Sequence, residues 1–114
     1  MTVLRVVPVV TVPDVEASAS AMARTLGMTE VMNHGWIVTL ANDTNQISIM
    51  SKDATAEVNP TMSVEVDDVD ATYRQVVADG LKIVHPLTDE EWGVRRFFFA
   101  DGSGNVMNVL SHRG

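Results

Sequence analysis

The chain carries one short motif in two versions, Val12-Pro13-Asp14-Val15-Glu16-Ala17 and Val66-Asp67-Asp68-Val69-Asp70-Ala71. In each version a β-branched stretch leads to an aspartate suited to cap a helix, because its carboxylate accepts a free backbone N–H of the first turn. A glycine, Gly27 or Gly80, ends each of the helical patterns that follow. Because an internal repeat of this kind indicates architecture, we predict two similar modules in tandem.

Each module is predicted to contain a strand, a helix and three further strands. In the first module, apolar side chains recur at helical spacing from Val15 to Leu26. Turn-forming runs such as Asn42-Asp43-Thr44-Asn45 separate the later strands. The expected strands are Val3–Val12, Met28–Met32, Trp36–Leu40, Gln46–Ser51, Thr61–Val66, Lys82–Leu87, Arg95–Ala100 and Val106–Ser111, and the helices begin after Asp14 and Asp68.

These elements predict an α+β fold of two βαβββ modules, each a curved, four-stranded mixed sheet with one helix. Side chains alternate across a strand, so Met62, Val64 and Val66 share one face and the polar residues between them the other. One sheet face then packs on the helix, and we expect the two free faces to enclose a cavity. The prediction is a single domain, 1–114, with module one at 1–53, a linker at 54–60 and module two at 61–114.

The composition excludes several functional classes. A chain of 114 residues is long enough for one domain. The absence of cysteine excludes disulfides, cysteine–zinc sites and iron–sulfur clusters. The net charge of −7 argues against binding to nucleic acid or to an anionic membrane. The apolar run Val6–Val12 is interrupted by Pro8 and is too short to span a bilayer or to resemble a signal peptide, so we expect a soluble, cytoplasmic protein.

One longer stretch adds a resemblance to a known family. It reads Trp92-Gly93-Val94-Arg95-Arg96-Phe97-Phe98-Phe99-Ala100-Asp101-Gly102-Ser103-Gly104-Asn105. Together with the paired modules, it resembles the glyoxalase/bleomycin-resistance/extradiol-dioxygenase superfamily, also called the vicinal oxygen chelate superfamily. Gly102 stands where that family usually has proline. The resemblance covers almost the whole chain and implies the βαβββ fold and a homodimer.

The same resemblance locates the places where metal enzymes of the family carry their ligands, in the first and last strand of each module. In this chain those places correspond to Val7, Ile49, Thr61 and Asn108. None of these side chains supplies the carboxylate or imidazole that a divalent cation prefers. We therefore expect no metal, no cofactor and no metal-dependent catalytic residue, and the chain resembles the metal-free, bleomycin-resistance-like branch.

The alternation of side chains between the two faces of each strand, together with the composition of one loop, indicates the candidate ligand-binding residues. Arg96 and Phe98 are predicted to lie on the sheet face opposite the helix. Trp92 stands beside Asp89-Glu90-Glu91, which suggests a platform for a planar cation, although Trp92 also suits a role in holding the loop to the sheet. The full set of candidates is Val7, Ile49, Thr61, Ser63, Glu65, Trp92, Arg96, Phe98, Asn108 and Leu110.

These features favour a metal-independent small-molecule binding protein of the bleomycin-resistance type. It would sequester a hydrophobic aromatic or cationic compound such as an antibiotic. The alternative is a metal-independent isomerase, cyclase or lyase acting on a natural product or small metabolite, with Glu65 or His85 as its base. A third hypothesis is a subunit or regulatory partner that binds no ligand.

Overall fold

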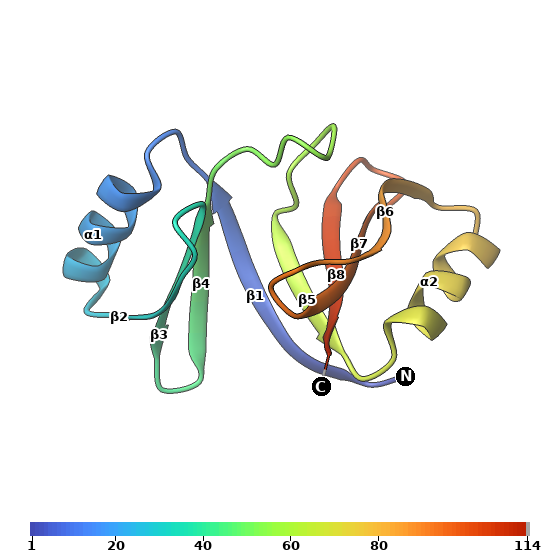
Figure 1. Cartoon of the computed structure of the whole chain (residues 1–114), viewed down its shortest axis with the longest axis horizontal. Helices are drawn as coiled ribbons and strands as arrows, with labels where there is room; N and C mark the ends of the chain where they lie inside the picture. The colour runs from blue at the N-terminus through green and yellow to red at the C-terminus, as the bar shows by residue number, and fades with distance from the viewer. Residues whose placement is uncertain (114) are drawn as a thin grey trace. The chain divides into compact units, whose positions relative to one another are not determined.

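The computed structural model describes residues 1–113 and shows the order βαβββ twice (Figure 1). This confirms the predicted α+β class with two tandem modules. The elements are β1 (Val3–Thr11), α1 (Val15–Leu26), β2 (Thr29–Asn33), β3 (Ile37–Asn42), β4 (Asn45–Met50), β5 (Met62–Val66), α2 (Val69–Ala78), β6 (Lys82–Asp89), β7 (Val94–Ala100) and β8 (Val106–His112).

The chain divides into two compact units whose boundary falls within β1. The N-terminal unit is Val7–Lys52, and the C-terminal unit consists of Met1–Val6 together with the chain from Asp53 onward. The strand order is β2-β3-β4-β1 in the N-terminal unit and β1-β5-β8-β7-β6 in the C-terminal unit, with β1 divided between them. Both sheets are mixed, because β1 runs parallel to β4 and β5 runs parallel to β8.

The two capping aspartates perform the role that their positions predict. The backbone N–H of Ala17 donates to Asp14 Oδ1 at 3.0 Å, and that of Ala71 donates to Asp68 Oδ1 at the same distance. Gly27 ends α1 in the left-handed conformation, with φ of 66°. Without a Cβ, glycine adopts this conformation at little steric cost.

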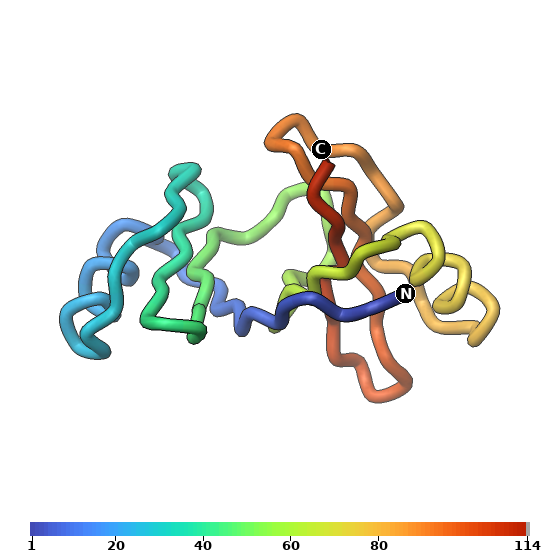
Figure 2. The backbone as a smooth tube through the Cα atoms, turned by 90° about the horizontal axis from the view of Figure 1, so that it is seen from below, coloured from blue at the N-terminus to red at the C-terminus, as the bar shows by residue number. Residues whose placement is uncertain are grey.

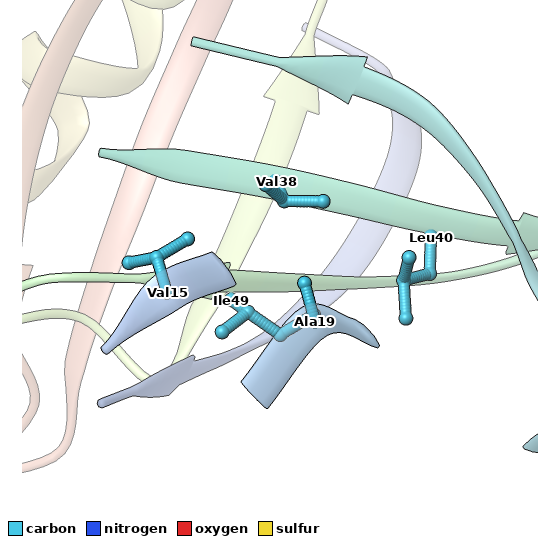
Figure 3. Close-up of a cluster of buried hydrophobic side chains, with 5 residues drawn as sticks. All are labelled: Val15, Ala19, Val38, Leu40 and Ile49. Carbon is cyan, nitrogen blue, oxygen red and sulfur yellow. The ribbon is translucent and has the colours of Figure 1, made fainter. Parts of the chain in front are cut away.

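In the N-terminal unit, α1 covers one face of the sheet. Its buried side chains Val15 and Ala19 pack against Val38, Leu40 and Ile49 (Figure 3). The opposite face carries a hydroxyl pair, in which the oxygens of Thr39 and Ser48 lie 2.7 Å apart.

The position of Ile49 corrects the repeat alignment by one residue. Val38 pairs with Ile49 in the N-terminal unit, whereas its counterpart Phe97 pairs with Val109 in the C-terminal unit. The β7–β8 hairpin is therefore one residue longer than the β3–β4 hairpin between equivalent pairs. Ser48, and not Ile49, corresponds to Asn108, and Ile49 points into the α1 core.

In the C-terminal unit, α2 packs on one face of its sheet, and the side chains of β7 alternate between the two faces as predicted. Phe97 and Val109 lie in the core beneath α2, where the ring of Tyr73 meets that of Phe97 edge-on with centroids 5.1 Å apart. A second buried cluster contains Phe98, Ala100 and Val106 together with Ala56. Phe98 alternates with Phe97 along β7, so its ring lies on the face opposite α2.

Neither helix in the described part of the chain is long and apolar enough to cross a membrane.

Candidate ligand-binding site

The residue at the centre of the candidate site is Arg96, on the face of β7 opposite α2. Only 5% of its surface is exposed. Its Nη2 lies 2.9 Å from Asp53 Oδ2 and 2.9 Å from Glu90 Oε2. One buried guanidinium thus joins β7, the segment that leaves the N-terminal unit and the loop between β6 and β7.

Two aromatic rings lie against the same guanidinium. The Cζ atom of Arg96 is 5.1 Å from the centre of the Trp92 ring and 4.9 Å from that of Phe98. A cation over an aromatic face contributes about 2 kcal/mol when the pair is removed from water. Trp92 therefore stacks on a cation, as its acidic neighbours suggested, but that cation is a side chain of the protein itself.

The acidic run beside Trp92 is likewise engaged within the protein. Glu90 binds Arg96, and Asp89 Oδ1 accepts a hydrogen bond from Arg95 Nη1 at 3.1 Å. The platform expected for an external planar cation thus already carries internal ion pairs. The loop-holding role of Trp92 agrees with this geometry.

The segment 53–60, which we call the strap, connects β4 to β5 (green in Figures 1 and 2) and contacts residues on this same sheet face. Asp53 Oδ1 accepts hydrogen bonds from the backbone N–H and the hydroxyl of Thr55 at 2.8 and 2.6 Å. The Thr55 hydroxyl in turn lies 3.0 Å from His85 Nε2, and Ala56 packs in the cluster of Phe98. The segment predicted as a plain linker is therefore part of the site.

The charge state of Asp53 follows from this environment. Burial raises the pKa of the Asp53 carboxyl, but the hydrogen bonds from Thr55 and the nearby Arg96 guanidinium outweigh burial and hold that pKa below its usual value. Asp53 is therefore an anion at neutral pH. Asp53 was not among the predicted site residues, because it stands 43 residues from Arg96 in a polar stretch without a motif.

The other candidates from β5 and β8 lie on the same face. Asn108 Nδ2 donates to Ser63 Oγ at 3.1 Å, across the parallel pair of strands. Leu110 is buried and pairs with Arg96 in the register of β7 and β8. The Thr61 hydroxyl lies 3.5 Å from the carbonyl oxygen of Val106. Apolar, amide and hydroxyl groups thus adjoin the Arg96 cluster.

Glu65 lies on this face as well, but both of its carboxylate oxygens have charged or ionisable neighbours. Oε1 is 3.4 Å from Arg5 Nε, and Oε2 is 2.6 Å from His112 Nδ1. These contacts join the beginning of β1 and the end of β8 to β5. Glu65 therefore acts as a link between strands.

The family is settled by a comparison that covers nearly the whole chain. Residues 3–109 match the model of the Glyoxalase/Bleomycin resistance protein/Dioxygenase superfamily. The chain belongs to this superfamily. No curated protein matches it.

Solved structures agree with this assignment at the level of the fold. A superfamily member from Vibrio splendidus 12B01 is 18% identical with a TM-score of 0.67, and the match covers 97% of this chain and 99% of that one. Methylmalonyl-CoA epimerase from Mycobacterium tuberculosis is 19% identical with a TM-score of 0.68, over 98% and 88% of the two chains. A protein described as an NAD-dependent benzaldehyde dehydrogenase from Legionella pneumophila is 14% identical with a TM-score of 0.77, over 95% and 99%.

The residues at the places where metal enzymes of the superfamily carry their ligands supply none of the usual donor groups. With the corrected alignment the corresponding residues are Val7, Ser48, Thr61 and Asn108. No carboxylate or imidazole stands among them, and the Asn108 amide already binds Ser63. Over residues 1–113, no three His, Asp or Glu side chains are grouped to hold a metal. These residues do not fit the divalent centre of the superfamily's enzymes.

Proposed function

We propose that the protein is a metal-independent binding protein that sequesters a planar aromatic compound, such as an antibiotic, in the cytoplasm. The supporting observation is that the Arg96 guanidinium lies over two aromatic rings, those of Trp92 and Phe98. Trp92 remains partly exposed. Rings and guanidinium planes are effective stacking surfaces for aromatic ligands.

The cation already present over the Trp92 ring disfavours a second cation at the same place. The Arg96 guanidinium carbon lies 5.1 Å from the ring centre, and Asp53 and Glu90 both direct an oxygen to Arg96, so these two carboxylates are already engaged. The net charge of −7 still attracts cations over long range, but this attraction weakens as salt increases. We therefore retain the aromatic part of the sequence-based hypothesis and drop the requirement for positive charge.

The alternative of a metal-independent isomerase, cyclase or lyase requires a base that faces the ligand. His85 has a neighbour at each ring nitrogen, with Nδ1 2.8 Å from the carbonyl oxygen of Pro86 and Nε2 3.0 Å from Thr55 Oγ1. Glu65 is held by Arg5 and His112. These contacts favour binding over catalysis.

The proposed function predicts that phenanthridinone, a neutral planar tricycle, binds with a Kd of about 1 μM or lower and is recovered unchanged. Micromolar affinity corresponds to about 8 kcal/mol, most of which must come from buried apolar surface. The titration follows indole emission in a Trp36→Phe variant, so that Trp92 is the reporting indole. Trp92→Ala should weaken binding about tenfold or more, measured by calorimetry because that change removes the reporter.

Two controls make this test specific. Trp36 lies in the N-terminal unit, stacked on His34 with ring centroids 6.4 Å apart, so Trp36→Phe should leave the affinity unchanged. The N-methylphenanthridinium cation has nearly the same shape and should bind no more tightly than phenanthridinone. Normal binding by Trp92→Ala would contradict the stacking site, and chemical conversion of the ligand would favour the enzyme hypothesis.

We also propose that the protein is a homodimer. The first half of β1 exposes the apolar side chains Val3, Leu4 and Val6, and exposed apolar strand residues are a hazard that a second subunit can cover. Light scattering at micromolar concentration should give about twice the chain mass of 12.4 kDa. A measured mass equal to that of one chain would refute the dimer. A Leu4→Lys variant should weaken the dimer and shift the measured mass toward that of one chain.

A further inference from the structure

His85 lies on β6 with only 4% of its surface exposed, and each of its ring nitrogens has a polar neighbour. Nδ1 is 2.8 Å from the carbonyl oxygen of Pro86, and Nε2 is 3.0 Å from the hydroxyl oxygen of Thr55 in the strap. A histidine ring nitrogen donates a hydrogen bond when it carries a hydrogen and accepts one when it does not. These two neighbours therefore determine how many protons the ring holds.

Both neighbours act as acceptors toward the ring. The Pro86 carbonyl oxygen cannot donate, and it also accepts from the Thr88 hydroxyl at 2.8 Å. The Thr55 hydroxyl has a single hydrogen, which it donates to the ionised Asp53 carboxylate at 2.6 Å, so its oxygen only accepts from His85. The ring then donates from both nitrogens, which is the hydrogen-bonding pattern of the imidazolium cation.

The charges around this ring also favour a cation. The charged groups on the strap, β6, β7 and the β6–β7 loop that adjoin this face are Asp53, Glu57, Lys82, Glu90, Glu91 and Arg96. Glu91 is exposed, and Glu57 pairs with Lys82 at the surface. The other three are nearly buried and set two carboxylates against one guanidinium. A protonated His85 balances this buried cluster, whereas an uncompensated charge away from water is costly. The Phe98 ring, 5.0 Å away between ring centres, is a further favourable neighbour for a cation.

Loss of the ring proton breaks one of these hydrogen bonds in either neutral form. A bare Nδ1 faces the Pro86 oxygen, so the ring must turn, and that turn carries Nε2 away from Thr55. A bare Nε2 faces the Thr55 oxygen, and the hydroxyl can turn to it only by breaking its bond to Asp53. The connection from β6 through Thr55 to Asp53 is therefore weakened in both cases.

We propose that a proton on His85 fastens the strap to the sheet, so that the strap is held in weakly acidic solution and loosens as the pH rises. This device goes beyond the proposed function and needs no ligand. Only the closed strap offers acceptors to both ring N–H groups, so closure and the proton favour each other. The stabilisation is complete on the acidic side of the histidine range, about pH 5 to 8, and is lost as the pH rises through it.

Amide hydrogen exchange on the full-length protein measures how often the strap opens. The reporter is the backbone N–H of residue 55, which donates to Asp53 Oδ1 at 2.8 Å. After correction for the intrinsic exchange rate, its protection should fall at least about tenfold between about pH 5.5 and 8, as expected for the loss of one hydrogen bond to a charged group. Protection that stays constant or rises over this range would overturn the proposal.

Two threonine variants separate the His85 contact from general effects of pH. Thr55→Val removes the hydroxyl between His85 and Asp53, so protection at residue 55 should no longer vary with pH in this range. Thr88→Val is the matched control, because the Thr88 hydroxyl donates to the same Pro86 carbonyl from the strand of His85 itself. In this control the tenfold fall should persist. A pH dependence that survives in Thr55→Val, or one that disappears in Thr88→Val, would contradict the assignment.

Nitrogen NMR of the His85 ring tests the proton directly. At about pH 6 both ring nitrogens should carry hydrogen, and the ring should lose one proton over the range in which protection of the strap falls. His85→Gln cannot gain this charge, so its strap protection should be independent of pH. His34→Gln, at an exposed position in the N-terminal unit, should behave like the unmodified protein. A neutral His85 ring beside a fully protected strap would overturn the proposal.

Discussion

Arg96→Met is expected to lower the free energy of unfolding by about 3–5 kcal/mol, because it leaves two nearly buried carboxylates without their cation. The side chains of Asp53 and Glu90 are 10% and 15% exposed, and both bind Nη2 of Arg96. Methionine keeps a long apolar side chain near Trp92 and Phe98, so the loss of stability mainly reflects the missing charge and its hydrogen bonds. Urea denaturation at pH 7 measures the difference.

The adjacent residue provides a matched control for this change. Arg95 also binds two carboxylates, those of Asp70 and Asp89, but its side chain is 32% exposed. Exposed ion pairs are worth about 0–1 kcal/mol, so Arg95→Met should cost much less. Similar losses in the two variants would show that burial of the Arg96 cluster is not the source of its effect.

The cost of Arg96→Met should also shrink as the pH falls. The pKa of Asp53 is held below its usual value in the folded protein, since the bonds from Thr55 and Arg96 overcome the effect of burial. A carboxyl with a lowered pKa stabilises the fold above its unfolded pKa, about 3.9, and loses that contribution as the pH falls through the folded value. The gap between variant and native protein should therefore narrow below about pH 4, and a gap that widens there would contradict this account.

Phe97→Ala is the second change with a large expected effect, again about 3–5 kcal/mol of lost stability. Phe97 is 0% exposed, and its ring contacts Tyr73 beneath α2. Alanine leaves a void that the sheet and helix fill only in part. Phe99→Ala is the comparison, because Phe99 packs at the margin of the same cluster and is only partly buried. Chemical denaturation of both variants should give the larger loss for Phe97, and the reverse order would be inconsistent with the observed core.

Local rules were sufficient for the secondary structure and for the assignment of sheet faces. The capping residues Asp14 and Asp68 and the alternation along β5 and β7 act over a few residues, and the structure confirms all of them. The repeat alignment predicted that Ile49 is equivalent to Asn108, and that prediction was wrong, because Ser48 is the equivalent residue. The β7–β8 hairpin is one residue longer, and a shift of one residue moves a strand side chain to the other face.

The sheet face of the candidate residues was predictable from the sequence, whereas their contacts were not. The alternation of side chains along β7 and β8 was enough to predict that Arg96, Phe98 and Asn108 lie on the face opposite α2. The sequence held no sign that Asp53 would reach Arg96, because residues 43 positions apart meet only through the path of the whole chain. The sequence suggested that Trp92 and Glu90 could receive an external cation. In the structure both contact the Arg96 guanidinium.

By itself the sequence determined the repeat, the capped helices and the alternating strands, since these follow from short-range sterics and hydrogen bonding. Only the tertiary structure decided that the strap packs on the sheet, that the Arg96 guanidinium lies over the indole of Trp92, and that Asp53 and Glu90 both bind Arg96 Nη2. Those outcomes depend on which distant groups compete for one buried cation. Long-range packing decides which groups bind the cation. A contact between charges is strong only when the charges are removed from water, and that happens only when the folded chain surrounds them.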